Sequence, residues 1–152
     1  MLKFKSMRKN EFDKYVKEAV MKIAEEYTTA GFCKKEESMD IAKTIFEQYL
    51  PNGLETEGQF LFNIVNDNEE KVGIIWYGIA KEKEVFICDF IILEKYRGKG
   101  YGKLAMRLLE EHVKSMGINK ITLHVFGHNQ PAIALYEKMG YKTFSMHMAK
   151  EI

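Results

Sequence analysis

The residues best suited to binding a ligand are three alternating glycines, Gly98, Gly100 and Gly102, set among basic side chains. They lie between a predicted buried strand and a predicted amphipathic helix. Glycine lets the backbone approach a ligand closely, and the first N–H groups of a helix point outward without partners. Positive charge gathers at the same end of the helix, on Lys95, Arg97, Lys99, Lys103 and Arg107. The segment therefore predicts a site for a polyphosphate.

Two common nucleotide-binding motifs do not fit this segment. A P-loop would need glycine at position 97 and serine or threonine at position 104, where the chain has Arg97 and Leu104. A Rossmann fingerprint would need a third glycine at position 103, which is Lys103. A plain turn with solvated lysines is the other interpretation, but three alternating glycines are more than a turn requires.

A different pattern fits both this segment and a second one. Arg97-x-x-Gly100-x-Gly102 resembles the pyrophosphate-binding motif of the GNAT acetyltransferases. The second motif of that family, N-x-x-A-x-x-L-Y-x-x-x-G-[FY], is similar to Asn129, Ala132, Leu135, Tyr136, Gly140 and Tyr141. The spacing between the two motifs also matches. The resemblance covers about residues 58–150.

The resemblance implies that acetyl-CoA is the co-substrate, held in a V between two parallel strands that splay apart. Those strands would be residues 85–93 and 121–126. Strand residues would pair with the pantetheine arm, the glycine-rich loop would hold the pyrophosphate, and Asn129 would meet the pantetheine or cap the following helix. The implied binding residues are Phe90, Ile91, Ile92, Arg97, Gly98, Lys99, Gly100, Tyr101, Gly102, Lys103 and Asn129.

Acetyl transfer to a primary amine poses two proton problems. The attacking amine must be neutral, although a lysine amine has a pKa of about 10.4, and the departing thiolate needs a proton. Tyr136 is the candidate acid by its match to the motif, with a core aromatic as the alternative. His124 is a candidate base because a histidine is mostly neutral near pH 7. Asp89, the one charge in an apolar strand, is the rival, and it would either act as the base or bind the acceptor's ammonium. Bound water is a third source of the base.

Other reactive residues give weaker patterns. His124-x-x-x-His128 has a zinc-like spacing, but the segment is predicted to be a strand and turn, so no metal is expected. Cys88 lacks a clear histidine partner, which disfavours a covalent cysteine mechanism. Core packing is a better interpretation than an acceptor-pocket lining for three aromatic residues, Trp76, Tyr77 and Phe126.

Periodicity predicts the elements that position these residues. An apolar stripe from Phe12 to Tyr27 predicts a helix capped at Asn10 and stopped by Gly31, and a second helix ends before Pro51. The remaining predictions are strands at 60–65, 71–80, 85–93, 121–126 and 141–148, helices at 103–116 and 129–139, and a first strand at 2–5. The fold class is α+β. The resemblance implies the GNAT fold, a mixed and mostly antiparallel twisted sheet with flanking helices, whose two central parallel strands are joined by a right-handed crossover.

Composition narrows the class of protein. A net charge of +1 disfavours nucleic-acid binding, and 46% hydrophobic with 30% charged residues is typical of a globular protein. Neither a signal peptide nor a membrane span is expected, which favours a cytoplasmic location with Cys33 and Cys88 reduced. One domain is expected over 1–152, with a helical acceptor-side region at 1–57 and an acetyl-CoA-binding core at 58–152.

One departure from the family concerns the acceptor side. Only 12 residues follow Gly140, enough for one strand where the family usually has a hairpin. The pocket would then be open, or completed by the N-terminal helices or by a partner subunit in a homodimer. The predicted function is N-acetylation of a primary amine of a small molecule or of a protein or peptide. The alternatives are a non-catalytic acyl-CoA sensor and an interaction domain built on the N-terminal helices.

Overall fold

A computed structural model describes residues 1–152 and divides them into five strands, four helices and two short 3₁₀ turns. The strands are β1 (Lys3–Ser6), β2 (Gln59–Val65), β3 (Lys71–Lys81), β4 (Glu84–Ile92) and β5 (Lys120–Leu123). The helices are α1 (Lys9–Thr29), α2 (Lys35–Tyr49), α3 (Tyr101–Ser115) and α4 (Gln130–Lys138). None of the helices combines the length and the apolar character that crossing a lipid bilayer requires.

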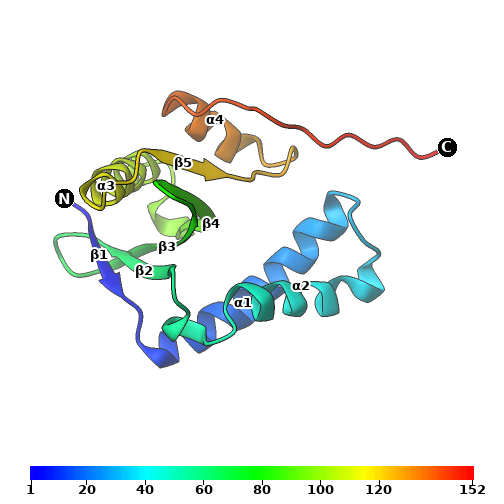
Figure 1. Cartoon of the computed structure of the whole chain (residues 1–152), viewed down its shortest axis with the longest axis horizontal. Helices are drawn as coiled ribbons and strands as arrows, with labels where there is room; N and C mark the ends of the chain where they lie inside the picture. Colours follow the sequence, from blue (N-terminus) through cyan, green and yellow to red (C-terminus); the bar gives the residue numbers. More distant parts are fainter.

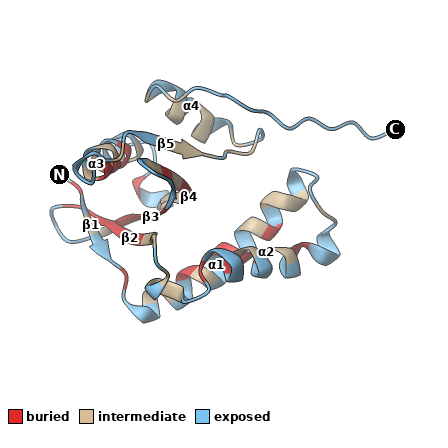
Figure 2. Ribbon diagram, viewed as in Figure 1, coloured by how far each residue is buried: buried red, intermediate tan, exposed pale blue.

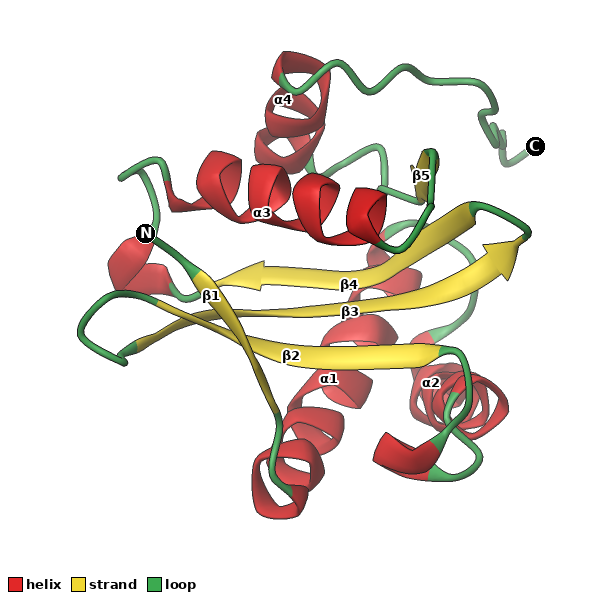
Figure 3. Cartoon of the chain, turned by 60° about the vertical axis from the view of Figure 1, so that its left-hand side comes forward, coloured by secondary structure: helices red, strands yellow, loops and turns green.

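The strands form one sheet in sequence order, β1-β2-β3-β4-β5 (Figure 3). All neighbours are antiparallel except β4 and β5, which are parallel. Parallel neighbours need a crossover connection, and α3 supplies it. The prediction of a mixed, mostly antiparallel sheet with one parallel pair is confirmed.

Helices cover both faces of this sheet, so the protein has two hydrophobic cores (Figures 1 and 2). On one face α3 buries Ala105, Met106 and Leu109 against β2, β3 and β4. On the other face α1 and α2 pack on Leu61, Ile74 and Trp76. The N-terminal helices therefore share a core with the sheet.

The start of α1 differs from the prediction. The helix is capped at Arg8 rather than Asn10, because the Glu11 carboxylate accepts the backbone N–H of Arg8 at 2.8 Å. This contact satisfies a backbone N–H at the start of the helix, and the helix therefore begins two residues earlier than it would with a cap at Asn10. Its end is as predicted, with Gly31 at φ +80° just beyond the helix.

The C-terminal part of the chain also departs from the prediction. β5 ends at Leu123, so His124 and Phe126 follow the strand instead of lying in it. Residues 141–148 form no strand, and after the N–H of Tyr141 no backbone group of the last residues bonds within the chain. Residues 141–152, the C-terminal tail, run away from α4 in extended form (Figure 1). Alternating apolar residues indicate that a strand would have one buried face, but they do not supply the neighbour that covers it.

Candidate active site

The two parallel strands separate at the centre of the sheet. β4 and β5 pair only from Glu84 to Ile87 of β4, opposite Lys120 to Leu123. β4 continues to Ile92 and keeps β3 on its other side. The backbone groups of Phe90 to Ile92 that face away from β3 therefore have no strand partner, and a V opens where the sequence predicted it.

A β-bulge lies where the strands separate. Trp76 of β3 pairs with Asp89, and Tyr77 pairs with Ile87, which leaves Cys88 without a cross-strand partner. A bulge bends its strand and changes the direction of the side chains that follow. Here it sets the position of Asp89 at the mouth of the V.

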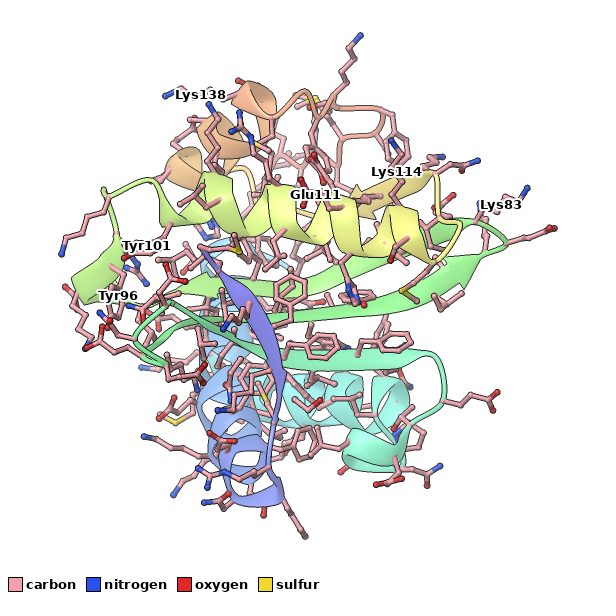
Figure 4. The ribbon with its side chains drawn as sticks, turned by 90° about the vertical axis from the view of Figure 1, so that its left-hand side faces the viewer. Lys83, Tyr96, Tyr101, Glu111, Lys114 and Lys138 are labelled. Carbon is pink, nitrogen blue, oxygen red and sulfur yellow. The ribbon has the colours of Figure 1, made fainter.

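The glycine-rich segment, residues 97–103 and hereafter the phosphate loop, leads into α3. The backbone N–H groups from Gly98 to Lys103 donate no hydrogen bond within the chain. Gly98 at φ +71° and Gly100 at φ +82° hold the left-handed conformation that this path requires. Tyr101 marks this end of α3 in Figure 4, opposite Lys83 and Lys114. Six free N–H groups at a helix N-terminus form a cradle suited to an anion.

Side chains fix the cradle at both sides. Arg97 Nε donates to the carbonyl of Ile92 at 2.8 Å, which ties the phosphate loop to the end of β4. A Cβ on Gly102 would lie 3.2 Å from Leu135 of α4, so this glycine lets α3 and α4 pack closely. The two sequence motifs therefore meet in the fold. Asn129 acts as the cap of α4, with its side chain accepting the N–H of Ala132 at 3.3 Å.

A cavity of about 390 Å³ lies beside the V and is hereafter the acceptor pocket. Asp89, His124 and Tyr136, the three predicted catalytic candidates, all line it, together with Asn129. Its aromatic lining comes from both halves of the chain: Tyr27, Phe32, Tyr49, Trp76, Phe86, Phe90 and Phe126. Trp76 and Phe126 thus line the pocket, whereas Tyr77 is fully buried in the α3-side core.

The N-terminal helices close this pocket. Tyr27 at the end of α1 and Phe32 in the following loop both pack edge-on against Phe126, with ring centroids 5.6 and 5.9 Å away. Phe126 also packs between His124 and His128. The zinc-like spacing of these two histidines therefore reflects an aromatic cluster that joins α1 to the β5–α4 connection.

Asp89 has two partners on α1. The hydroxyl of Tyr15 donates to Asp89 Oδ2 at 2.7 Å, and Lys22 Nζ lies 3.8 Å from Oδ1. Only 14% of the Asp89 side chain is exposed. The sequence places Tyr15 only on an apolar stripe, and it does not predict that Tyr15 and Lys22 contact Asp89. Nothing in the periodicity shows that α1 crosses β4 at Asp89. The opposing hydroxyl and ammonium groups match an ionised carboxylate.

Burial and the charge of Asp89 raise the pKa values of the neighbouring tyrosines and of Cys88. Burial first, and then Asp89, raise the pKa of Tyr136 to about 12 and that of the Cys88 thiol to about 12. Burial, with a further contribution from Asp89, also raises the pKa of Tyr15 well above its usual range. Tyr136 therefore keeps its proton at neutral pH, as an acid must, and Cys88 stays a poorly nucleophilic thiol.

The pKa of His124 shifts in the opposite direction. Partial burial, and then the nearby His147 of the C-terminal tail, lower the pKa of His124. The imidazole is consequently neutral over a wider pH range than an exposed histidine. A neutral ring can accept a proton, so the position and charge state of His124 both suit a base.

Comparison with known proteins identifies the family. Residues 17–141 match the acetyltransferase (GNAT) family. The chain belongs to this family. This GNAT acetyltransferase is 38% identical to the uncharacterized N-acetyltransferase YycN and 33% identical to the uncharacterized N-acetyltransferase YdgE, both of Bacillus subtilis. Each alignment covers 96% of this chain and at least 95% of the relative. The family and the enzyme class predicted from the two motifs are confirmed.

Solved structures extend the comparison to the whole fold. The crystal structure of YycN superposes with a TM-score of 0.97 over 100% of this chain and 99% of that one. The first 140 of 152 residues alone would give at most about 0.92, so the extended tail of this GNAT enzyme is shared by YycN. A PaiA acetyltransferase of Thermoplasma acidophilum, solved with coenzyme A, shares the fold at a TM-score of 0.69 and 15% identity, over 97% of this chain and 93% of that one.

The contact between Tyr15 and Asp89 leads to a stability prediction. Tyr15→Phe removes the hydroxyl and leaves a mostly buried carboxylate with one fewer donor. We expect the free energy of unfolding to fall by about 1.5–3 kcal/mol, the usual range for a hydrogen bond to a charged group. Urea denaturation measures it, with the exposed Tyr49→Phe as the control. Equal stability of Tyr15→Phe and the wild type would contradict the importance of this contact.

Proposed function

We propose that this GNAT enzyme transfers an acetyl group from acetyl-CoA directly to a primary amine held in the acceptor pocket. The observation that carries the proposal is the convergence of two features at one opening of the sheet. One is the cradle of six unpaired N–H groups, which suits a pyrophosphate. The other is the pocket lined by an acid, a base and an anion.

The residues available for acetyl-CoA fit the shape of that molecule. The phosphate loop, with the charges of Arg97, Lys99 and Lys103, would hold the pyrophosphate. The open edge of β4 at Phe90 to Ile92 would pair with the amide groups of pantetheine, with Asn129 on the opposite side. Acetyl-CoA supplies the activated thioester, which would reach the acceptor pocket between β4 and β5.

The acceptor would enter as an ammonium and bind beside Asp89. Asp89 is mostly buried and lies among aromatic rings, and a carboxylate in such surroundings favours a cation. Glu26 of α1 also lines the pocket, and burial raises its pKa. The apolar lining then suits an acceptor whose amine is attached to an aliphatic or aromatic body, and residues 1–57 would form the wall that selects it.

His124 would take the proton that frees the amine for attack. Asp89 is the less suitable base, because it already accepts from Tyr15 and faces Lys22. Tyr136 would then donate its phenolic proton to the sulfur that leaves. Asp89 therefore acts on the charge of the ammonium, His124 on its proton and Tyr136 on the departing sulfur.

Removing the acid should slow the chemical step without weakening binding. In Tyr136→Phe we expect kcat to fall about tenfold to a hundredfold, at or below the lower limit of the usual range for general acid catalysis, because a thiolate is a moderate leaving group. KM for acetyl-CoA should change little. Thiol release followed with a chromogenic disulfide measures both constants. Unchanged kcat would remove Tyr136 from the mechanism and would favour the alternative that Tyr136 is a packed core aromatic.

The base gives a pH signature. Because the pKa of His124 is lowered, the acidic limb of kcat/KM for the acceptor should have its midpoint below about 6.5, the usual histidine value. In His124→Gln this limb should disappear, and kcat should fall about 10²-fold. His147→Gln is the matched control, and it should move the limb to slightly higher pH. A His124→Gln profile that keeps the wild-type limb would assign the base elsewhere.

An acceptor screen tests the proposed function as a whole. The enzyme would be incubated with acetyl-CoA and a panel of aliphatic, aromatic and peptide amines, with thiol release as the readout. We expect turnover with amines that carry an apolar body and none with the matching alcohols. Turnover of alcohols alone would contradict an amine acceptor.

A further inference from the structure

One lysine of the chain already lies where the proposed acceptor amine would bind. Lys22 of α1 is the only lysine among the residues that line the acceptor pocket. Its Nζ atom lies 3.8 Å from Asp89 Oδ1, and Asp89 is the carboxylate proposed to receive the ammonium of the acceptor. When no other amine is bound, the protein therefore presents a primary amine of its own to the site.

The contact between Lys22 and Asp89 holds the lysine only loosely. The distance of 3.8 Å is too long for a hydrogen bond, whereas the Tyr15 hydroxyl donates to the other carboxylate oxygen at 2.7 Å. The Lys22 side chain is 46% exposed, and ion pairs with an exposed partner contribute little to stability. Because the ammonium is carried on a flexible aliphatic stem, the Lys22 nitrogen can leave Asp89 and move within the pocket at little cost.

The groups that would activate an external amine lie around Lys22 as well. His124 and Tyr136 line the same pocket. Asp89 contributes, after burial, to the raised pKa of Tyr136, so one carboxylate lies near both Lys22 and the proposed acid. Burial raises the pKa of Glu26, one turn further along α1, and the positive charge of Lys22 counteracts that rise. Two carboxylates of the pocket therefore attract Lys22 toward the proposed base and acid.

We propose that Lys22 is a modification site of this enzyme, which transfers the acetyl group of acetyl-CoA to Lys22 Nζ of the same chain when no external amine fills the pocket. The inference rests on the proposed function, because it uses the same donor, acid and base. An external amine would compete with Lys22 for Asp89, so the modification would belong to the enzyme that has its donor but lacks its acceptor.

The transfer balances as the aminolysis of a thioester. His124 takes one proton from the Lys22 ammonium and passes it to solvent. The free nitrogen attacks the carbonyl carbon of acetyl-CoA, so that an N–C bond forms and the C–S bond breaks. The nitrogen loses a second proton to solvent as the amide forms, while Tyr136 protonates the departing sulfur and regains its own proton from solvent. The products are acetylated Lys22, CoA and one proton.

Mass spectrometry on the purified full-length protein tests this inference. The protein is incubated with acetyl-CoA in a buffer free of amines, and the acetylated fraction of each lysine is measured before and during incubation. We expect one acetyl group per chain on Lys22, formed at least about tenfold faster than on the exposed Lys17 of the same helix, because a positioned amine reacts faster than one that meets the thioester by collision.

The dependence on protein concentration shows whether the transfer occurs within one chain. The rate of Lys22 acetylation per chain should be the same over a wide range of protein concentration, at a fixed saturating concentration of acetyl-CoA. A rate per chain that rises in proportion to protein concentration would overturn transfer within a chain.

Variants separate catalysed transfer from chemical acetylation. Lys22→Arg keeps a positive charge beside Asp89 but offers no nucleophilic amine, so it should lose the rapid acetylation, whereas Lys17→Arg should keep it. Gly100→Glu, which alters the phosphate loop, should abolish the acetylation of Lys22 and leave the slow acetylation of Lys17 unchanged. Equal rates at Lys22 and Lys17, or a Gly100→Glu variant that modifies Lys22 as the wild type does, would overturn the inference.

The result can be distinguished from that of the proposed function. Amine turnover in the acceptor screen tests the function without reference to Lys22. An enzyme that acetylates amines of the screen while Lys22 stays unmodified in their absence would overturn this inference alone. A protein that binds acetyl-CoA but neither acetylates an amine nor modifies Lys22 would contradict the proposed function as well.

Discussion

Replacing Gly100 with glutamate is expected to abolish binding of acetyl-CoA, lowering the affinity by at least about 10³-fold. The N–H groups around Gly100 have no partner within the chain, and they are the proposed contacts of the pyrophosphate. A carboxylate at this position would place negative charge where the phosphates lie, in addition to straining a backbone at φ +82°. Calorimetric titration with acetyl-CoA measures the loss.

A second glycine separates charge at the site from backbone strain. Gly117 follows α3 at its other end with φ +81°, and, like Gly100, it has no atom within 4 Å of an added Cβ. Gly117→Glu therefore introduces the same charge and a similar strain far from the phosphate loop. It should bind acetyl-CoA as the wild type does. Wild-type affinity in a folded Gly100→Glu variant would place the phosphates elsewhere.

Removing the charge of Asp89 should have the second-largest effect. In Asp89→Asn we expect kcat/KM for the amine to fall about 10²–10³-fold, because breaking a buried, hydrogen-bonded charge pair costs about 2–5 kcal/mol. Asparagine keeps the size of the side chain and an oxygen that can accept from Tyr15. KM for acetyl-CoA should stay within about twofold of the wild type. Steady-state kinetics with each substrate varied in turn measure the two effects.

The exposed Asp13 on α1 provides the control for net charge. Asp13→Asn changes the total charge equally but lies on the outer face of the helix, paired with Lys9. Its kinetics should match those of the wild type, since exposed charge pairs contribute little. An Asp89→Asn enzyme with normal acceptor kinetics would show that the ammonium binds away from this carboxylate.

The sheet and the binding loop could be predicted from local patterns. The phosphate loop is a local feature, since glycines and basic residues at a strand-to-helix junction act through groups within a few residues of each other. The parallel pair also followed from the strand–helix–strand order, because such crossovers have few solutions. The contact of Gly102 with Leu135 gives a physical reason why the two motifs occur together.

The surroundings of Asp89 could not be predicted in the same way. The bulge at Cys88 depends on how β3 and β4 align over their whole length, and a one-residue shift leaves no mark in a nearly continuous apolar strand. Tyr15 and Lys22 reach Asp89 only because α1 crosses the sheet at that point. Such crossings are set by packing between segments more than 60 residues apart in sequence.

The predicted strand at 141–148 was wrong for a related reason. Its alternating residues indicate a tendency to pair, but a strand exists only where an edge receives it, and this chain does not bring its own edge to the tail.

The measurement that tests the central claim most directly is calorimetric titration of the purified wild-type protein with acetyl-CoA, CoA and ATP in parallel. The free N–H groups of the phosphate loop and the open edge of β4 predict saturable binding of acetyl-CoA and CoA, with one site per chain, and much weaker binding of ATP. Absence of binding by both CoA compounds, or a preference for ATP, would contradict the assignment of the site.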